Sequence, residues 1–276
     1  MTRLYRVLSL GAGVQSSTLL RLSIRGELPR LDAAIFSDTQ YEPAAVYAHL
    51  ARLETEAAAV GIPLYRVTRG SIRHDALTAQ RAGCRTGGRN FGSMPYFVDH
   101  KDGSERGQIR RQCTKEYKLR PIRAKLRALV GLAPGERVGD KVRVEQWLGF
   151  SADELHRVRQ SRDYWITLRY PLIFDLTPAW RRQDCVAWLA RNYPDPVPRS
   201  ACIACPFRSN AEWRAMRECD PTSWAEAVTF DRAVRKLRGM RGDVYVHSSL
   251  RPLDEAPIDT DDPRQGSLFS CGVCGT

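Results

Sequence analysis

The sequence predicts an α/β fold, a Rossmann-like parallel sheet with helices on both faces, followed by a helical C-terminal part that carries cysteines. Three observations lead to this prediction. The first part of the chain alternates short apolar runs with amphipathic segments, which is the rhythm of strands joined by helices. A glycine turn follows the first apolar run, at the place where α/β sheets hold ligands. The 276 residues are 43% hydrophobic, enough for the core of one large domain.

Short apolar runs bounded by turn residues predict the strands, which in chain order are residues 4–10, 31–37, 63–67 and 142–150. Apolar residues that recur every three or four positions predict the helices, which are residues 16–24, 42–60, 114–129, 177–192 and 212–237. Residues 70–110 are rich in glycine, arginine and polar residues, so we expect a long functional loop there. Prolines break the chain at residues 194–198.

The net charge and the cysteine content indicate which kind of partner and which cellular compartment to expect. Lys and Arg total 43 against 31 Asp and Glu, a net charge of +12 that favours a nucleotide or nucleic-acid partner, although a basic surface without a partner fits it equally well. We expect neither a membrane span nor a signal peptide, because the apolar runs are too short. Eight cysteines in such a chain predict a reducing, cytoplasmic compartment, where thiols more often serve metals or catalysis than disulfides.

The turn after the first strand predicts a phosphate site. Glycines let the backbone approach a ligand closely, and the following helix N-terminus offers free N–H groups. The candidate phosphate ligands here are Ser9, Gly11, Gly13, Gln15, Ser16 and Ser17. The segment is not a Walker A motif, since no Gly-Lys-Ser/Thr follows, and a Rossmann fingerprint would need glycine at Ser16. The alternative is a plain tight turn between strand and helix.

Three segments make the chain resemble the PP-loop superfamily of adenine-nucleotide α-hydrolases. Ser9-x-Gly11-Ala12-Gly13-Val14-Gln15-Ser16 is similar to Ser-Gly-Gly-x-Asp-Ser, with one residue inserted and no aspartate. Residues 36–42 are similar to apolar-x-Asp-Thr-Gly-x-Glu, and residues 149–154 to Gly-Ile-Ser-x-Asp-Glu. Within the superfamily the chain resembles the phosphoadenosine-phosphosulfate-reductase-like branch, which includes sulfonucleotide reductases and the sulfur-transfer ATPase of DNA phosphorothioation.

The resemblance implies an adenine nucleotide at the edge of the sheet. Beyond the turn, the nucleotide ligands that it suggests are Phe36, Asp38, Gly149, Ser151, Asp153, Arg157 and Arg208. Asp38 is also a catalytic candidate, with helix capping as its alternative. Residues Ser151 and Glu154 could equally form a capping box.

Residues 111–122 resemble one half of the cluster-binding site of iron–sulfur sulfonucleotide reductases, and residues 200–208 resemble the other half. The resemblance implies Cys113, Cys202 and Cys205 as ligands of a [4Fe–4S] cluster. Two thiolates three residues apart can bind one metal centre, and a cluster with three protein ligands leaves one iron open to sulfur. Zinc would suit the same thiols by its chemistry, and buried thiols without a metal are the remaining alternative.

The C-terminal tail and one basic segment add further candidates. Cys271 and Cys274 lie between glycines and are our catalytic candidates, as persulfide or nucleophile carriers. They could instead supply a fourth cluster ligand or have no role. Residues 106–127 hold nine Lys or Arg and one acid, which suits a nucleic-acid backbone arriving beside Cys113. Alternatively, these charges serve the nucleotide and the cluster.

Together these features predict an ATP-dependent sulfurtransferase that uses Mg²⁺ and a [4Fe–4S] cluster. It would adenylate an acceptor such as tRNA or DNA, release pyrophosphate and insert sulfur from an unidentified donor, and it could act as a homodimer. The alternatives are a sulfonucleotide reductase and a non-catalytic nucleotide- or nucleic-acid-binding protein with structural zinc. The PP-loop nucleotide-binding α/β domain would span residues 1–175, and a helical C-terminal region, residues 176–276, would pack on it.

Overall fold

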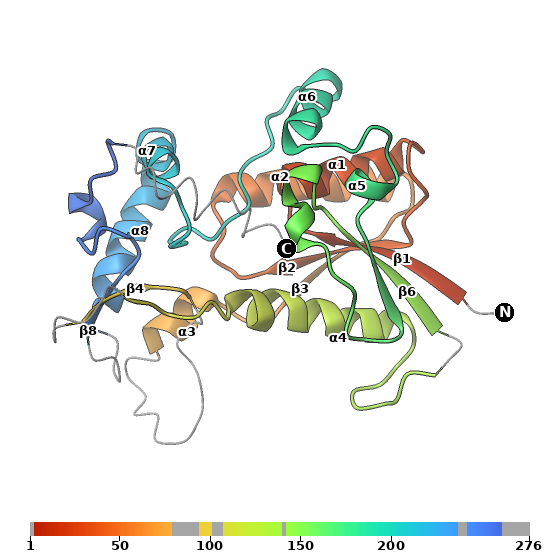
Figure 1. Ribbon diagram of the computed structural model, residues 1–276, viewed down its shortest axis with the longest axis horizontal. Coiled ribbons are helices and arrows are strands. Elements are labelled where there is room, and N and C mark those ends of the chain that lie inside the picture. The colour runs from red at the N-terminus through yellow and green to blue at the C-terminus, as the bar shows by residue number, and fades with distance from the viewer. Residues whose placement is uncertain (1–2, 79–93, 101–106, 140–141, 237–241, 261–276) are drawn as a thin grey trace.

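The centre of the molecule is a five-stranded parallel sheet. The computed structural model describes residues 3–78, 94–100, 107–139, 142–236 and 242–260 (Figure 1). The strands lie in the order β3-β2-β1-β6-β7, and every neighbouring pair is parallel. Their bounds are β1 Arg3–Leu10, β2 Ala33–Asp38, β3 Leu64–Thr68, β6 Val142–Leu148 and β7 Ile166–Arg169. The predicted fold class is confirmed.

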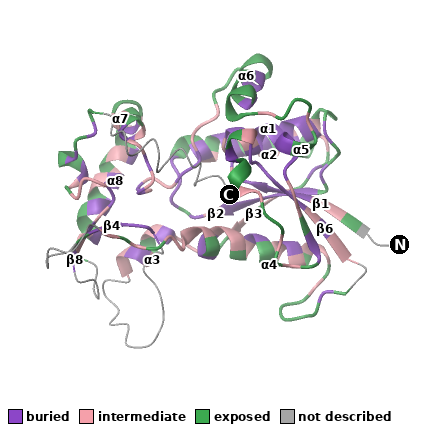
Figure 2. Ribbon diagram, in the orientation of Figure 1, coloured by how far each residue is buried: buried purple, intermediate pink, exposed green. Residues whose placement is uncertain are grey.

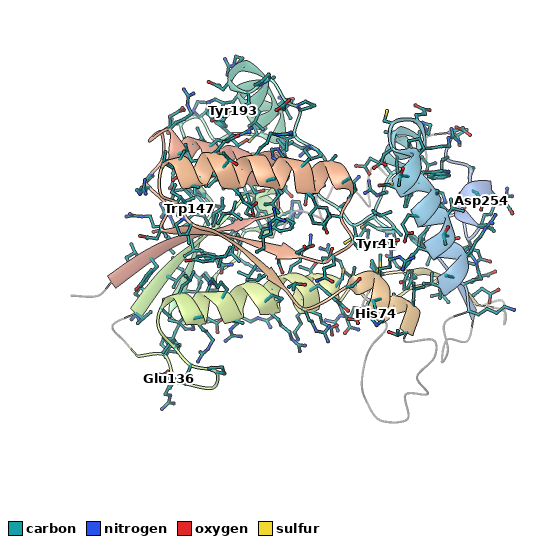
Figure 3. All side chains as sticks on the ribbon, turned by 180° about the vertical axis from the view of Figure 1, so that it is seen from behind. Tyr41, His74, Glu136, Trp147, Tyr193 and Asp254 are labelled. Atoms are coloured by element: carbon teal, nitrogen blue, oxygen red, sulfur yellow. The ribbon has the colours of Figure 1, made fainter. Side chains whose placement is uncertain are left out.

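Helices cover both faces of this sheet. One face carries α1, α2 and α6, and the other carries α4 (Figure 1). Their bounds are α1 Val14–Ile24, α2 Ala44–Ala59, α4 Arg120–Leu129 and α6 Arg182–Asn192. Trp147 of β6 is fully buried between the sheet and the helices of the first face (Figure 3). Because both faces are covered, five of the six residues of β2 are buried, and the strand is a continuous apolar run.

A second, antiparallel sheet forms beside the first, in the order β5-β4-β8. It consists of β4 Phe97–His100, β5 Gly107–Gln108 and β8 Gly242–Tyr245 and packs with α3 Ile72–Thr78, α7 Asn210–Cys219 and α8 Pro221–Val234. Tyr96, Trp213 and Phe230 are fully buried at its core. This group lies at one end of the molecule, and Figure 2 shows buried residues in its strands and helices.

Several sequence predictions need correction. Part of the expected loop at residues 70–110 forms α3, β4 and β5, because β4 finds its partner β8 far along the chain. The expected helix at 212–237 is two helices, separated where Asp220 caps α8 and Pro221 begins it. The helix expected from residue 177 begins at Arg182. Short elements not predicted are β7, β8, α5 Pro171–Phe174 and the helical turns η2 Ala152–Arg157 and η3 Leu253–Glu255. The helix expected at residues 114–129 consists of the π-helical turn η1 Thr114–Leu119 followed by α4.

The domain division stays a prediction, but the packing suggests where its two parts touch. The second core joins residues 72–117 to residues 204–258, whereas α6 packs on α1 in the first core. Within the described ranges, no helix has both the length and the apolar character needed to cross a membrane.

Candidate functional site

The candidate site lies at the carboxyl edge of the parallel sheet, where the strand order reverses. From β1 the chain proceeds to β2 and β3 on one side, and β6 and β7 lie on the other side. Ligands of open α/β sheets bind in the crevice at this reversal. The loops that follow β1 and β6 flank it, and they contain the predicted segments that start at Gly11 and Gly149.

The turn after β1 is tight and cross-linked to itself. Ala12 has a positive φ of 56°, and Gly13 is the N-cap of α1. The backbone N–H of Gly11 donates to Ser16 Oγ at 3.2 Å, and this hydroxyl donates to Gly13 O at 3.3 Å. The first turn of an α-helix leaves its N–H groups without partners in the helix and carries the positive end of the helix dipole. The turn therefore leaves backbone N–H groups without helix partners at the start of α1, and phosphate binding there stays a prediction.

Gly149 supports this turn from the next strand. A Cβ added at Gly149 would lie 2.9 Å from the backbone N of Ser16 and 3.2 Å from the carbonyl carbon of Gln15. Only a residue without a side chain lets the end of β6 approach α1 this closely. The structure thus gives Gly149 a packing function, and its predicted contact with the nucleotide stays a prediction.

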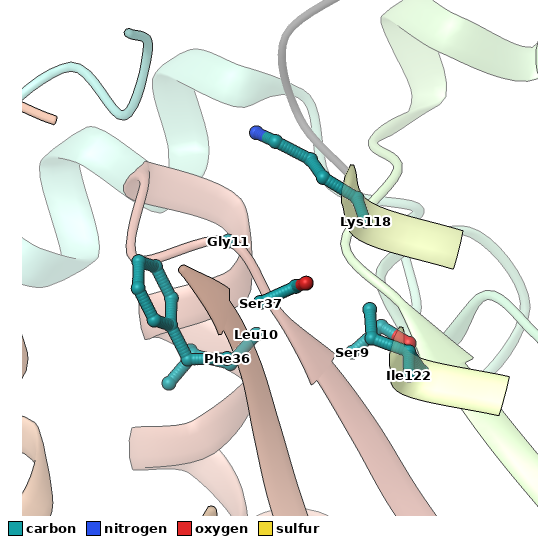
Figure 4. Close-up of a pocket in the computed structure, with 7 residues that line it drawn as sticks. All are labelled: Ser9, Leu10, Gly11, Phe36, Ser37, Lys118 and Ile122. Atoms are coloured by element: carbon teal, nitrogen blue, oxygen red, sulfur yellow. The ribbon is translucent and has the colours of Figure 1, made fainter. Parts of the chain in front are cut away.

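A small open pocket lies at the ends of β1 and β2 (Figure 4). Its lining residues are Ser9, Leu10, Gly11, Phe36, Ser37, Lys118 and Ile122. Three of the predicted nucleotide ligands, Ser9, Gly11 and Phe36, thus share one pocket. The hydroxyl of Ser9 is held there because it accepts a hydrogen bond of 2.7 Å from Gln146 Nε2.

Lys118 is the charged residue among the pocket residues that the sequence analysis did not single out. Its side chain extends from η1 across the mouth of the pocket (Figure 4). The η1 segment is a π-helical turn, and such turns are frequent at functional sites. Ser37 Oγ donates to the carbonyl of Tyr117 at 2.6 Å, which ties η1 to the end of β2. The only sequence signal was the basic character of residues 106–127.

Asp38 holds the loop that follows β2. Its Oδ1 accepts hydrogen bonds from the backbone N of Gln40 at 2.7 Å and from Tyr47 OH at 2.9 Å. Gln40 has a positive φ of 56°, so the first bond stabilises a strained turn. Burial and the hydrogen bond to Asp38 raise the pKa of Tyr47 above its ordinary value. These contacts give Asp38 a loop-shaping role, and its catalytic role stays a prediction.

The loop after β6 forms a network with the start of α1. Gln15 Nε2 donates to Glu154 Oε2 at 3.2 Å, and Gln15 Oε1 accepts from Arg182 Nη1 at 3.1 Å. Glu154 is buried and forms an ion pair with Arg157. Gln15 thereby joins α1 to both η2 and α6.

The other predicted ligands after β6 also face neighbouring protein groups. Asp153 Oδ2 accepts from the backbone N of Arg182 at 2.7 Å and from Ser151 Oγ at 3.4 Å. The Arg157 guanidinium lies 4.1 Å from the centre of the Phe150 ring. Ser151 and Asp153 therefore shape the rim of the crevice, and their contact with a nucleotide stays a prediction.

Ser17 points away from the turn into the helix layer. It is fully buried, and its Oγ lies 2.9 Å from His49 Nε2 of α2. Burial, followed by the charges of Arg21 and Arg52, lowers the pKa of His49 to about 4. A neutral imidazole is therefore part of the α1–α2 packing, and Ser17 stabilises the helix pair with its hydroxyl.

We expect His49 to make folding stability depend on pH. Its pKa is about 4 in the folded protein and about 6.5 in an unfolded chain. The unfolded state therefore binds more protons between these values, and stability rises with pH. This difference should add about 3 kcal/mol to the free energy of unfolding above pH 6.5, and this contribution should be lost as the pH falls to 4. Urea unfolding at pH 7 and 4.5 measures this difference.

Two variants separate the contribution of His49 to the pH dependence of stability from that of the carboxylates, which titrate in the same pH range. His49→Gln should show a smaller loss of stability between pH 7 and 4.5 than the wild type. His74→Gln, at an exposed position, should show the wild-type loss. An equal loss in all three proteins would contradict the expectation.

Two of the predicted cluster ligands lie at the same end of the sheet. Thr39 Oγ1 lies 3.3 Å from Cys202 Sγ, and this thiol lies 3.8 Å from the Glu42 carboxylate. Burial raises the pKa of Cys202 well above its ordinary value, Glu42 raises it further, and Lys118 lowers it. Cys113 also raises this pKa slightly, and both thiols pack against the same buried core.

Cys205 is joined to Cys202 by one tight turn, in which Cys205 N donates to Cys202 O at 3.1 Å. Arg208, which the sequence suggested as a nucleotide ligand, is buried behind this loop. It donates to the carbonyls of Ala201 and Cys202 at 3.1 and 3.2 Å. In the part of the chain that the structure describes, no three His, Cys, Asp or Glu side chains are grouped to hold a metal ion. Cys271 and Cys274 lie outside the described residues.

Neither a family model nor a curated protein sequence matches the chain. A crystal structure of phosphoadenylyl-sulfate (PAPS) reductase from Candida auris, in complex with phosphate, is similar in structure. The match has a TM-score of 0.40 and 15% sequence identity, and it covers 72% of this chain and 76% of the reductase chain. A functional proposal therefore has to rest on the residues of the chain itself.

Proposed function

We propose that the protein is an ATP-dependent sulfurtransferase. ATP would bind with its phosphates at the turn of residues 11–17, and Mg²⁺ would accompany them. An acceptor oxygen would attack the α-phosphorus, pyrophosphate would leave, and a sulfur nucleophile would then displace AMP. Adenylation makes this oxygen a good leaving group.

One observation carries the proposal, namely that Lys118 belongs to both halves of the site. It lines the pocket at the ends of β1 and β2, and its charge lowers the pKa of Cys202. The ammonium group of Lys118 would therefore act both on a phosphate in the pocket and on the thiol of Cys202 in the loop of residues 200–208, which we call the cysteine loop. This supports nucleotide and sulfur chemistry at one place.

The thiols fit an iron–sulfur cluster in their chemistry. Cys113, Cys202 and Cys205 are soft ligands, the first two pack against the same buried core, and the last two are one turn apart. These three would hold the cluster, which supplies an iron that can bind sulfur as a Lewis acid. Among the described residues, no three side chains are grouped closely enough to bind a single metal ion. A cluster at these three thiols is compatible with that finding, because the ligands of a cluster lie further apart than those of a single ion.

One experiment tests the proposed sulfurtransferase activity and distinguishes it from a sulfonucleotide reductase and from a non-catalytic binding protein. The full chain is reconstituted anaerobically with iron and sulfide, and its iron, sulfide and zinc contents are measured. Pyrophosphate release from ATP is then assayed with and without tRNA or DNA. Pyrophosphate release that an acceptor stimulates supports the proposal. Sulfite release from a sulfonucleotide indicates a reductase instead, and bound zinc without either activity indicates a binding protein.

The acceptor that we propose is a nucleic acid. Several basic residues near Cys113 already have protein partners: Arg123 pairs with Asp163, and Lys125 lies on the ring of Tyr65. The exposed basic residues of this segment that form no ion pair with the described acidic residues are Arg110, Lys115 and Arg120. Three unpaired cations beside the site suit a phosphate backbone.

Replacing these three residues together by glutamine should weaken tRNA or DNA binding. The slope of log K against log salt concentration should become shallower by about 2 to 3, since each lost phosphate contact accounts for about 0.7 to 0.9. Fluorescence anisotropy over a salt series measures the slope. Arg137, Arg191 and Arg251 are exposed elsewhere, and their triple glutamine variant removes the same charge as a control. Equal slopes in the two variants would count against a nucleic-acid acceptor at this place.

A further inference from the structure

The loop that leads to the thiols lies directly on the nucleotide turn. A Cβ added at Gly13, the N-cap of α1, would lie 3.6 Å from the Cβ of Ser200. Ser200 precedes Cys202 by two residues, so the turn and the cysteine loop touch through this side chain.

The hydroxyl of Ser200 has an unusual environment. The residue is 7% exposed, and its Oγ is buried without a hydrogen-bond partner among the residues that the structure describes. The other buried serines around the site do have partners: Ser9 pairs with Gln146, Ser17 with His49 and Ser37 with a carbonyl. A buried hydroxyl without a partner costs free energy, and a bound ligand is one explanation for such a group.

The backbone that follows Ser200 is anchored by a buried arginine. Arg208 is buried and donates hydrogen bonds to the carbonyls of Ala201 and Cys202, the two residues after Ser200. Ala201 is itself 1% exposed. The side chain of Ser200 is therefore held against Gly13 by its neighbours.

The adjoining helix end supplies complementary donors. The backbone N–H groups of Val14, Gln15 and Ser16 occupy the first turn of α1, where no carbonyl of the helix can accept from them. Together with the dipole of an 11-residue helix, they favour an anion at Gly13. Ser200, whose Cβ lies beside Gly13, adds a buried hydroxyl next to this helix end.

We infer that Ser200 is a further ligand of the nucleotide, donating its hydroxyl to a phosphate oxygen held at the N-terminus of α1. This inference rests on the proposed function, because it takes the anion to be the phosphate chain of ATP. Its consequence is a direct connection between phosphate binding and the loop of Cys202 and Cys205. The loop that carries the thiols then also contributes a ligand to the nucleotide.

The test compares Ser200→Ala with the wild type and with Ser223→Ala, a buried serine in α8 remote from the turn. Calorimetric titration of the full chain uses ATP, pyrophosphate and adenosine as probes. We expect Ser200→Ala to bind ATP and pyrophosphate about tenfold more weakly, which is about 1.4 kcal/mol, and adenosine unchanged. Its melting temperature without ligand should equal or exceed that of the wild type, since the variant loses an unsatisfied hydroxyl.

Each result decides the inference and the proposed function separately. Equal affinity of wild type and Ser200→Ala for ATP overturns the inference and leaves the function standing. A wild type that binds pyrophosphate but not ATP, with Ser200→Ala weaker, supports Ser200 as a ligand and overturns the function. Binding of neither probe overturns both. A Ser200→Ala protein that melts earlier without ligand, or does not fold, also overturns the inference, because the hydroxyl would then have a structural partner.

Discussion

Replacing Gly149 by alanine should destabilise the fold and remove ATP binding together. The new methyl group would lie 2.9 Å from the backbone N and 3.1 Å from the Cα of Ser16. Both atoms belong to the first turn of α1, so relief of the clash must move the helix end where we propose that the phosphates bind. Overpacking of this kind costs about 1–3 kcal/mol. Urea unfolding gives the loss of stability, and calorimetric titration with ATP gives the loss of affinity.

A second glycine variant serves as the control for this expectation. Gly139 has no atom within 4 Å of an added Cβ, and its φ is not in the left-handed region. Gly139→Ala should therefore stay within about 0.5 kcal/mol of the wild type and bind ATP as before. If Gly149→Ala bound ATP with wild-type affinity, the packing of β6 against α1 would not be what shapes the anion site.

Lys118→Gln should lower the rate of pyrophosphate release from ATP about 100-fold, the typical effect of losing one donor to a developing charge. The ammonium group lies at the mouth of the pocket and would neutralise the phosphates there. The pKa of Cys202 should rise in this variant, because Lys118 lowers it in the wild type. Alkylation of this thiol should therefore become slower. Initial rates and mass spectrometry of the alkylated protein measure the two effects.

Lys125→Gln is a matched control, since it removes the same charge from the neighbouring helix α4. Lys125 lies 3.6 Å from the centre of the Tyr65 ring, away from the pocket lining. Its rate of pyrophosphate release should remain at the wild-type level. Equal losses in both variants would mean that overall charge, rather than the position of Lys118, accounts for the effect.

The parallel sheet was predictable because its elements are local. The first three strands and the helices between them follow each other within 68 residues, and each has its own apolar pattern. The second sheet was not predictable in this way, since β4 and β5 are short and acquire their structure from β8. The pairing of Val98 with Val244 leaves no trace in the sequence near either residue. Only the tertiary partner makes these residues a strand.

In the candidate site, too, the local features were predictable from the sequence and the tertiary ones were not. The glycine turn lies where the sequence places it, because strand, turn and helix are consecutive. Side-chain directions were not predictable: Ser17 points to His49, and Arg208 holds a loop, although both resemble ligands in the sequence. Lys118 was missed because its direction depends on the wider π-helical winding of η1. A periodicity of 3.6 residues does not describe that winding.

The pairing of β4 with β8 also bears on how the polypeptide is made. A ribosome adds about 5–20 residues per second, and early parts of a chain fold while later parts are still being synthesised. The core around Tyr96 and Phe230 includes residues up to 258, so it can form only after this part of the chain has been synthesised. Cys113 and Cys202 both pack against this core, and their surroundings are therefore incomplete until then. A cofactor that needs both thiols would have to be delivered after residue 258 has left the ribosome.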